Sequence, residues 1–278
     1  MTERKKLLPS KRSRGRVQIV TVAGGKGRIG KTFFSVNFGV TLKNRGFRVL
    51  IFDADLNLAN VHLLLNIDET QSFRDFLQGK IQIGEVIQKG IGGVEVLYVG
   101  DDLNSILSLD DEEFNILTSS FMQIEDSYDY IIIDTQAGLT ELNQKLLLLS
   151  DRVILMTSPE ITALVDLYRV IKTTAAGHSG LHFEILVNRA SGAEHAARVY
   201  DRISRTVSQF GIRSSLSFLG FIVDDPKRVV ESIQKRIPII LLHQTGSVSE
   251  CMKMITGSFL RQSRPRRKFP FFYGLLER

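Results

Sequence analysis

The chain has 278 residues, of which 43% are hydrophobic and 24% are charged. At about 150 residues per domain this length allows one large domain or two small ones, and the apolar content excludes a wholly disordered chain. The formal net charge of +6 is concentrated at the two ends, residues 1–16 and 261–278, which suggests an anionic partner. A single Cys251 and five scattered histidines do not favour a disulfide or a metal cluster built from these residues.

Apolar segments with the composition of buried strands alternate along the chain with segments of helical spacing. The predicted strands are Val17–Ala23, Arg48–Asp53, Val94–Val99, Tyr130–Asp134, Arg152–Thr157, Phe183–Asn188 and Leu216–Val223. The predicted helices cover residues 31–44, 105–125, 140–149, 160–176, 193–210 and 226–236. Strands that are apolar throughout are typical of a mostly parallel sheet covered by helices on both faces. The pattern predicts one doubly wound α/β domain over residues 17–260. The sequence contains no apolar run of the about 20 residues that a membrane-spanning helix needs. We therefore expect a cytoplasmic protein.

The segment between the first predicted strand and the first predicted helix, residues 24–32, satisfies two phosphate-binding patterns. Gly25, Gly27 and Gly30 match the dinucleotide fingerprint G-x-G-x-x-G. In that interpretation Asp53, at the end of the second strand, would hold a ribose hydroxyl. The same segment also matches the P-loop pattern G-x-x-x-x-G-K-[ST].

Lys31, Thr32 and a distant acid favour the P-loop. A nucleoside triphosphate needs a cation on its outer phosphates and a hydroxyl on Mg²⁺, whereas a dinucleotide needs neither. The apolar strand at residues 130–134 ends in Asp134, which supplies an acid for the magnesium shell. The loop backbone is expected to face the phosphates through the N–H groups of Gly27, Arg28, Ile29, Gly30, Lys31 and Thr32.

A second lysine inside the loop, Lys26, makes this segment resemble the deviant P-loop K-G-G-x-G-K-[ST] of the MinD/ParA group of ATPases. The resemblance implies ATP and Mg²⁺ as cofactors. It also implies a homodimer that forms on ATP and in which Lys26 reaches the phosphates of the partner chain. Lys26, Lys31 and Asp55 would then be the catalytic residues, with Asp55 placing the attacking water.

The remaining motifs are similar to the FlhG branch of this group, which regulates flagellar number and placement. They are Asp53–Val61, Asp134–Gly138, Ser158–Glu160, Val187–Arg189 and Leu219–Ile222. By this similarity Thr32, Asp55 and Asp134 serve the Mg²⁺, and Asn188 with Arg189 cradles adenine. The flagellar GTPase FlhF or flagellar assembly proteins are the partners that the resemblance implies.

Three positions depart from the family pattern, which usually has glycine where this chain has Arg28, Asn57 and Gln136. All three flank the phosphates, and a residue that needs a positive φ at such a position is strained. Glycine in a switch segment also gives mobility, so we expect weak hydrolysis with nucleotide binding retained. The short N-terminal tail lacks the glutamine-containing motif by which typical FlhG proteins stimulate FlhF.

The C-terminal segment, residues 261–278, joins a cationic cluster to aromatic residues at near-helical spacing. Phe271 and Leu275 are four residues apart, and Phe272 lies three residues before Leu275, so a short helix beginning after Pro270 would have one apolar face. Exposed apolar groups beside cations favour an anionic lipid surface. The segment occupies the place of the family's membrane-targeting helix, which predicts peripheral association with the inner face of the cell membrane. Packing of these aromatics back onto the body is the alternative.

Other classes of function remain open at this point. The chain is also compatible with a nucleotide-binding scaffold with little or no hydrolysis. A further alternative is a positioning ATPase of the MinD/ParA type for the division site or DNA. The apolar residues of the tail argue against specific DNA binding, because apolar groups add little to phosphate contacts. A nicotinamide oxidoreductase would use the glycine fingerprint and would not need Lys31.

Overall fold

The computed structural model describes residues 17–55, 61–67, 73–98, 111–178, 180–262 and 271–276. These residues form an eight-stranded sheet of order β3-β4-β2-β5-β1-β6-β7-β8, in which β3 runs antiparallel to β4 and every other pair is parallel. The strands are β1 (Gln18–Ala23), β2 (Val49–Ala54), β3 (Ile87–Lys89), β4 (Glu95–Tyr98), β5 (Tyr130–Thr135), β6 (Arg152–Thr157), β7 (Leu181–Ala190) and β8 (Ser214–Val223). The predicted doubly wound α/β fold with a mostly parallel sheet is confirmed.

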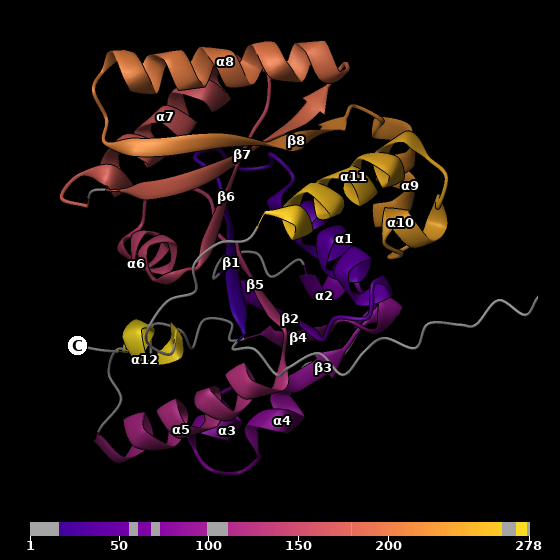
Figure 1. Ribbon diagram of the computed structural model, residues 1–278. Coiled ribbons are helices and arrows are strands. Elements are labelled where there is room, and N and C mark those ends of the chain that lie inside the picture. The colour runs from indigo at the N-terminus through magenta and orange to yellow at the C-terminus, as the bar shows by residue number, and fades with distance from the viewer. Residues whose placement is uncertain are drawn as a thin grey trace, which may run out of the picture.

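Helices cover both faces of this sheet (Figure 1). Along β1, Val20 and Val22 pack in one core cluster with α1 and α11, whereas Ile19 points to the opposite face, covered by α5 and α6. The helices α7 and α8 extend that second layer over β6 and β7. The longer helices are α1 (Lys31–Asn44), α5 (Asp111–Ser127), α6 (Glu141–Leu149), α7 (Ile161–Ala175), α8 (Ala193–Gln209), α9 (Pro226–Gln234) and α11 (Ser247–Arg261). The shorter ones are α2 (Val61–Leu64), α3 (Phe73–Leu77), α4 (Ile83–Val86), α10 (Ile239–Leu242) and α12 (Phe271–Leu276).

The order of the strands determines where a ligand can bind. From β1 the chain crosses to β2 on one side and later to β6 on the other, so the winding direction reverses at β1. In open α/β sheets, ligands bind beyond the carboxyl ends of the strands at such a switch point. The segment between β1 and α1 and the ends of β2 and β5 all lie at that edge.

One long helix was not predicted from the sequence. In α11, Val248, Met252, Ile255 and Phe259 are buried at helical spacing against α1 and β8. Gly257 and the β-branched residues lower the helix propensity of this segment, so tertiary packing rather than propensity stabilises it. The helix ends at Arg261, next to the boundary of residue 260 that the sequence predicts for the domain.

The C-terminal helix α12 is packed against the body of the molecule. The side chains of Phe271 and Phe272 are fully buried and Leu275 is nearly so. Phe272 stacks on Phe121 of α5 with ring centroids 4.1 Å apart, and its backbone N–H donates to the Glu125 carboxylate at 2.9 Å. The predicted helix is therefore present, but its apolar face is occupied by α5 and α6 and is not open to a membrane in this conformation. The basic residues 264–268 and the tail 1–16 lie outside the described residues.

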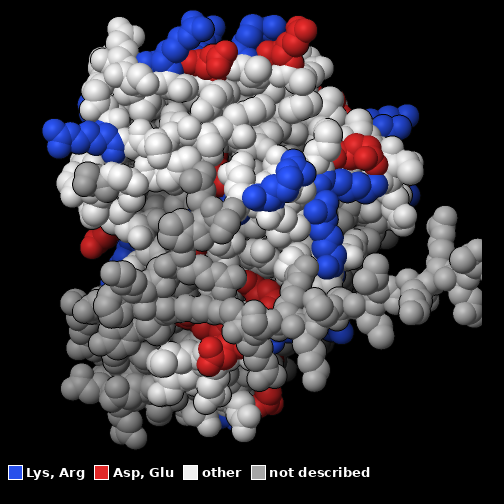
Figure 2. Space-filling view, viewed as in Figure 1, with Lys and Arg blue, Asp and Glu red and all other residues white. Residues whose placement is uncertain are grey.

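No helix among the described residues is long and apolar enough to cross a bilayer. Figure 2 shows basic side chains gathered over α1 and α11. Arg45 and Arg261 approach Gly257 from either helix, and Arg45 donates to the Lys253 carbonyl at 3.0 Å. This basic patch lies at the end of α11, where the cationic C-terminal segment begins.

Candidate functional site

The loop at residues 24–30 joins β1 to α1 at the carboxyl edge of the sheet. Gly30 has φ +95°, and a Cβ there would lie 2.6 Å from the Asn188 amide nitrogen. A Cβ on Gly25 would lie 2.4 Å from the backbone of Asp166 in α7. Glycine is required at both positions, because the loop passes too close to its neighbours for any side chain. The N-terminus of α1 faces the space above the loop, as anion binding requires.

Arg28 has a left-handed backbone conformation in this loop, with φ +60°. An L-residue with a side chain is strained there by about 1 kcal/mol, whereas glycine is not. The Arg28 carbonyl accepts a hydrogen bond from the Arg189 guanidinium at 3.0 Å, and Arg189 itself has φ +57°. The position occupied by glycine in the family pattern thus keeps its glycine-like conformation here, with an arginine in it.

Two buried acids stand side by side beneath the loop. Asp53 of β2 and Asp134 of β5 are paired in register, and both are almost completely buried. Burial raises the pKa of Asp134 to about 6 and raises the pKa of Asp53 well above its usual value, with the neighbouring carboxylate adding to the shift of Asp53. Lys31 is also buried, and burial lowers its pKa despite the attraction of Asp134 and Asp55. Three carboxyl groups, of Asp53, Asp55 and Asp134, therefore lie close to a single buried lysine.

These acids fit a divalent cation. Asp134 accepts hydrogen bonds from the side chains of Thr32 and Ser35, the latter at 2.8 Å through Oδ1. The second oxygens of Asp53 and Asp134 are buried and have no hydrogen-bond partner in the part of the chain that the structure describes. Buried carboxylate oxygens without partners are unfavourable unless a cation or its water ligands satisfy them. Oxygen donors of this kind, with the Thr32 hydroxyl beside them, are the ligands that Mg²⁺ prefers.

A cavity of about 810 Å³ lies beside the loop and changes in character along its length. Its polar end is lined by Gly27, Arg28, Gly30, Lys31, Thr32, Asp55, Gln136 and Ala137. The rest of its lining consists of Asn188, Arg189, Asp224, Asp225 and Pro226 with apolar side chains of α1, β8 and α9, namely Phe33, Ile222, Val223, Val229, Val230 and Ile233. The combination of a phosphate loop at one end with an apolar wall at the other suits a nucleotide.

Asn188 and Arg189 line this cavity and also hold the loop in place. The Asn188 amide donates to the Ile29 carbonyl at 2.7 Å and its oxygen accepts from the Arg189 backbone N–H at 2.9 Å. The structure therefore brings together the predicted nucleotide-binding residues from Gly27 to Thr32 with Asn188, Arg189, Asp55 and Asp134. Gly25 is part of the same loop.

Lys26 is a predicted site residue that does not line the cavity and is held by other contacts. Its ammonium forms an ion pair with Glu160, the residue before α7, and a 3.0 Å hydrogen bond with Thr162. The Lys26 cation lowers the pKa of the Glu160 carboxyl. Arg189 lies 4.0 Å from the same carboxylate. A lysine held outward in this way is available to a surface that approaches the mouth of the cavity.

The segment after Asp134 is tied down by side chains. The Gln136 amide donates to Thr140 at 3.2 Å, and the Asn143 amide donates to the carbonyls of Gln136 and Gly138. Thr140 also caps α6 by accepting from the Asn143 backbone. Gln136 is therefore held by hydrogen bonds to α6 and its N-cap. Asn57 lies outside the described residues.

Three features of the site were missed by sequence reasoning. Asp53 was assigned only a ribose contact in the dinucleotide interpretation, although it ends an apolar strand just as Asp134 does. Ser35 lies one helical turn after Lys31, and no pattern marked it. Glu160 was noted as part of a motif, but only the fold shows that it holds Lys26.

Comparison with known proteins agrees with this geometry. Residues 17–182 match the AAA_31 family, described as an AAA domain. The chain belongs to this family. It is also 28% identical to the antiactivator FleN of Pseudomonas aeruginosa over 259 residues, which cover 92% of each chain. The flagellum site-determining protein YlxH of Helicobacter pylori is 26% identical over 219 residues, covering 76% of this chain and 71% of YlxH.

A solved structure extends the similarity to the fold. The septum site-determining protein MinD of Pyrococcus horikoshii, complexed with Mg-ADP, is 25% identical and has a TM-score of 0.66 over 87% of this chain and 96% of its own. The resemblance to MinD/ParA-type ATPases that the sequence predicted, including its flagellar branch, is confirmed. By sequence and fold, the chain is similar to MinD/ParA-type ATPases.

Proposed function

We propose that this AAA_31 domain binds Mg²⁺ and ATP in the cavity beside the loop and uses them as a switch. The observation that carries the proposal is that Lys31 and Thr32 line the cavity while Asp134 lies buried behind them, hydrogen-bonded to Thr32. Beside them are two buried carboxylate oxygens without a hydrogen-bond partner among the described residues. A dinucleotide site gives no reason for a buried lysine and paired buried acids at the phosphate end. A triphosphate with a divalent cation explains both.

Each residue at the polar end has a distinct part in the proposed reaction. The backbone N–H groups of Gly27 to Thr32 bind phosphate oxygens, and the Lys31 ammonium neutralises the outer phosphates. Thr32 and Asp134, with Asp53 behind them, would hold a Mg²⁺, which would supply positive charge beside the phosphates. Asp55 lines the same end and orients the attacking water. At the opposite end, Asn188, Arg189 and the apolar wall hold the base.

Lys26 supports an ATP-dependent homodimer. Its ammonium is set outside its own cavity on an exposed ion pair, and such pairs in water are weak. A second chain that brings its bound triphosphate to this surface offers a stronger anion than Glu160. Dimerisation on ATP would therefore draw Lys26 away from Glu160 toward the partner's phosphates.

The C-terminal segment is proposed to bind an anionic membrane surface when α12 leaves its groove. Each phenylalanine buried in the groove contributes about 1.5–3 kcal/mol of hydrophobic free energy, and a lipid interface offers a similar gain. The exchange is therefore near balance for one chain, and pairing two tails in a dimer adds avidity. The basic patch of Arg45 and Arg261 lies at the start of this segment and has the charge that anionic lipid attracts.

The regulated process is proposed to be the number or placement of flagella. FleN is named an antiactivator and YlxH a flagellum site-determining protein, and FleN matches nearly the whole of this chain. Flagellar assembly proteins or a flagellar GTPase are the corresponding partners.

A second candidate is a nucleotide-binding scaffold with little hydrolysis. Arg28 in a left-handed conformation and Gln136 hydrogen-bonded to Thr140 both restrain segments that line the phosphate end. Restrained switch segments slow a rearrangement that turnover requires. Binding of ATP would be kept, because Lys31, Thr32 and Asp134 are intact.

Co-sedimentation with phosphatidylglycerol-containing liposomes tests the proposal. The full chain and a chain ending at Lys268 are compared in Mg-ATP and Mg-ADP, and retained nucleotide binding shows that the shorter chain is folded. We expect binding that requires both ATP and the tail. Equal binding in the two nucleotides would contradict the switch, and tail-independent binding would contradict the membrane role of α12.

A further inference from the structure

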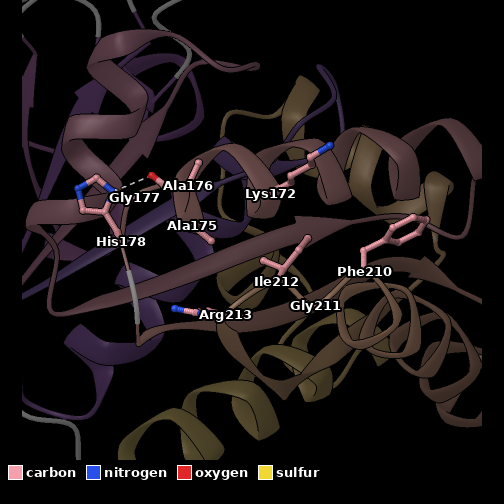
Figure 3. A pocket seen from close by; sticks show the side chains of 9 residues that line it. All are labelled: Lys172, Ala175, Ala176, Gly177, His178, Phe210, Gly211, Ile212 and Arg213. Carbon is pink, nitrogen blue, oxygen red and sulfur yellow. Dashed lines mark hydrogen bonds between the residues drawn. The ribbon is translucent and has the colours of Figure 1, made fainter.

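A second hollow, of about 500 Å³, lies at the edge of the sheet opposite the nucleotide cavity (Figure 3). It is formed where α7 and α8 end and where the chain turns into β7 and β8. Figure 3 shows the Phe210 ring at one end of this hollow and His178 at the other. Because it is remote from the loop at residues 24–30, the proposed ATP switch does not account for it.

The charged groups around the hollow have one sign. Lys172 and Arg213 line it and are exposed, and neither has an ion pair in the described part of the chain. The hollow has no acidic lining residue among those described. By contrast, Arg169, also on α7, is paired with Asp166 at 3.2 Å. The free cations of the hollow therefore provide charge complementarity for an anionic partner.

The hollow also presents an exposed aromatic ring. Phe210 is 65% exposed, and the Tyr168 ring, with its centroid 5.6 Å away, supports it from α7. Phe210 follows the last residue of α8, and Gly211 at φ +62° turns the chain immediately after it. Ile212 adds a half-buried apolar surface beside the ring. An aromatic anchor beside unpaired cations is the composition of a contact surface.

We propose that this hollow docks an acidic segment of a partner protein, with an apolar side chain of that segment placed against Phe210. Nucleic acid is the weaker fit. Sites for single strands use a continuous basic groove and several aromatic platforms, whereas one ring and two cations are present here. On the neighbouring outer face of α8 the charges are mixed, with Glu194 beside Arg198, and Figure 2 shows acidic and basic side chains interspersed along that helix. A hollow of this size accommodates one or two side chains of a peptide.

The test uses the full chain and a fluorescein-labelled, glutamate-rich copolymer of glutamate and tyrosine, followed by fluorescence anisotropy. Lys172→Glu/Arg213→Glu should weaken binding by at least about tenfold, and Phe210→Ala should weaken it by about three- to tenfold. The matched control is Arg202→Glu/Arg205→Glu, which makes the same change of charge on exposed residues of α8. That control should bind within about twofold of the wild type, and all variants should bind ATP normally.

Two results would overturn the proposal. In the first, the wild type does not bind the copolymer, or the two charge-reversal variants bind it with equal affinity. Either outcome would leave no role for the hollow. The other is labelled oligothymidylate binding more tightly than the copolymer and losing affinity in Lys172→Glu/Arg213→Glu, which would make the hollow a nucleic-acid site. Because the measurement needs neither ATP nor lipid, its failure is distinct from a failure of the ATP switch.

Discussion

The strain at Arg28 and the hydrogen bond of Gln136 act on the same end of the nucleotide cavity. Replacing Arg28, Asn57 and Gln136 together by glycine removes the positive-φ strain and releases the switch segments. We expect the steady-state ATPase rate to rise severalfold, with ATP affinity little changed. Arg28→Ala alone serves as the control, because alanine removes the charge but keeps the strain. A triple variant no faster than the wild type would show that these residues do not limit turnover.

The buried carboxyl of Asp134 predicts a pH-dependent stability. Its pKa is raised to about 6 by burial, above the about 3.9 of an unfolded chain. The folded state therefore binds this proton more tightly, and the stabilisation present below about pH 4 is lost as the pH rises through 6. Asp134→Asn should raise the free energy of unfolding by about 1–3 kcal/mol near pH 8 and by less near pH 5.

Urea unfolding in EDTA without nucleotide measures this effect. The exposed Asp126→Asn is the matched control and should show no difference between the two pH values. A loss of stability in Asp134→Asn of equal size at both pH values would mean that hydrogen bonds from Thr32 and Ser35 outweigh the charge. The same variant should lose Mg²⁺-dependent ATP binding.

The ion pair of Lys26 with Glu160 predicts a variant that dimerises more readily. Glu160→Gln removes the anion that holds Lys26 in the single chain, so less ATP is needed to draw the lysine across the interface. We expect the ATP concentration for half-maximal dimerisation to fall about two- to fivefold, the range of an exposed ion pair. Asp166→Asn, which breaks the ion pair with Arg169 on α7, should leave the ATP concentration for half-maximal dimerisation unchanged. An increase in the required ATP would indicate that Glu160 acts within the dimer instead.

At the scale of elements, the groove that holds α12 is the least expected part of the structure. Gly274 lies against α6, where an added Cβ would be 2.8 Å from the Leu149 side chain. Gly274→Leu should therefore weaken docking and at the same time enlarge the apolar face that lipid accepts. Liposome co-sedimentation in ADP should increase several-fold in this variant, whereas Phe272→Ser should bind poorly in either nucleotide. No increase for Gly274→Leu would mean that release of α12 does not control membrane binding.

The elements also show what a sequence can predict. Strands such as β5 and β6 were located within one residue, because unbroken apolar runs in a parallel sheet are distinctive. The helix α11 was not predicted, since its Gly257 and β-branched residues disguise an apolar face that only contact with α1 and β8 stabilises. The position of the loop between β1 and α1 could be predicted, because its glycines and Lys31-Thr32 are adjacent in the sequence. The Asp53 partner of Asp134 and the Glu160 partner of Lys26 depend on strand order and helix position, which are not local.

At the scale of the whole molecule, ATP must join two chains for the proposed switch to operate. The cavity lies at the carboxyl edge of the sheet, Lys26 stands outside its own cavity, and α12 is docked against α5 and α6. One bound ATP per chain would thus contact both Lys31 of its own chain and Lys26 of the other. The hollow at the opposite edge would stay accessible in such a dimer.

The most direct measurement is the mass in solution by light scattering after size exclusion, in Mg-ATP and in Mg-ADP. The chain carries Asp55→Ala to slow hydrolysis and is compared with the same chain that also carries Lys26→Ala. The account predicts about twice the 31.3 kDa of one chain for Asp55→Ala in ATP, and a single chain in ADP or when Lys26 is replaced. The same mass in both nucleotides, or a dimer that survives Lys26→Ala unchanged, would contradict it.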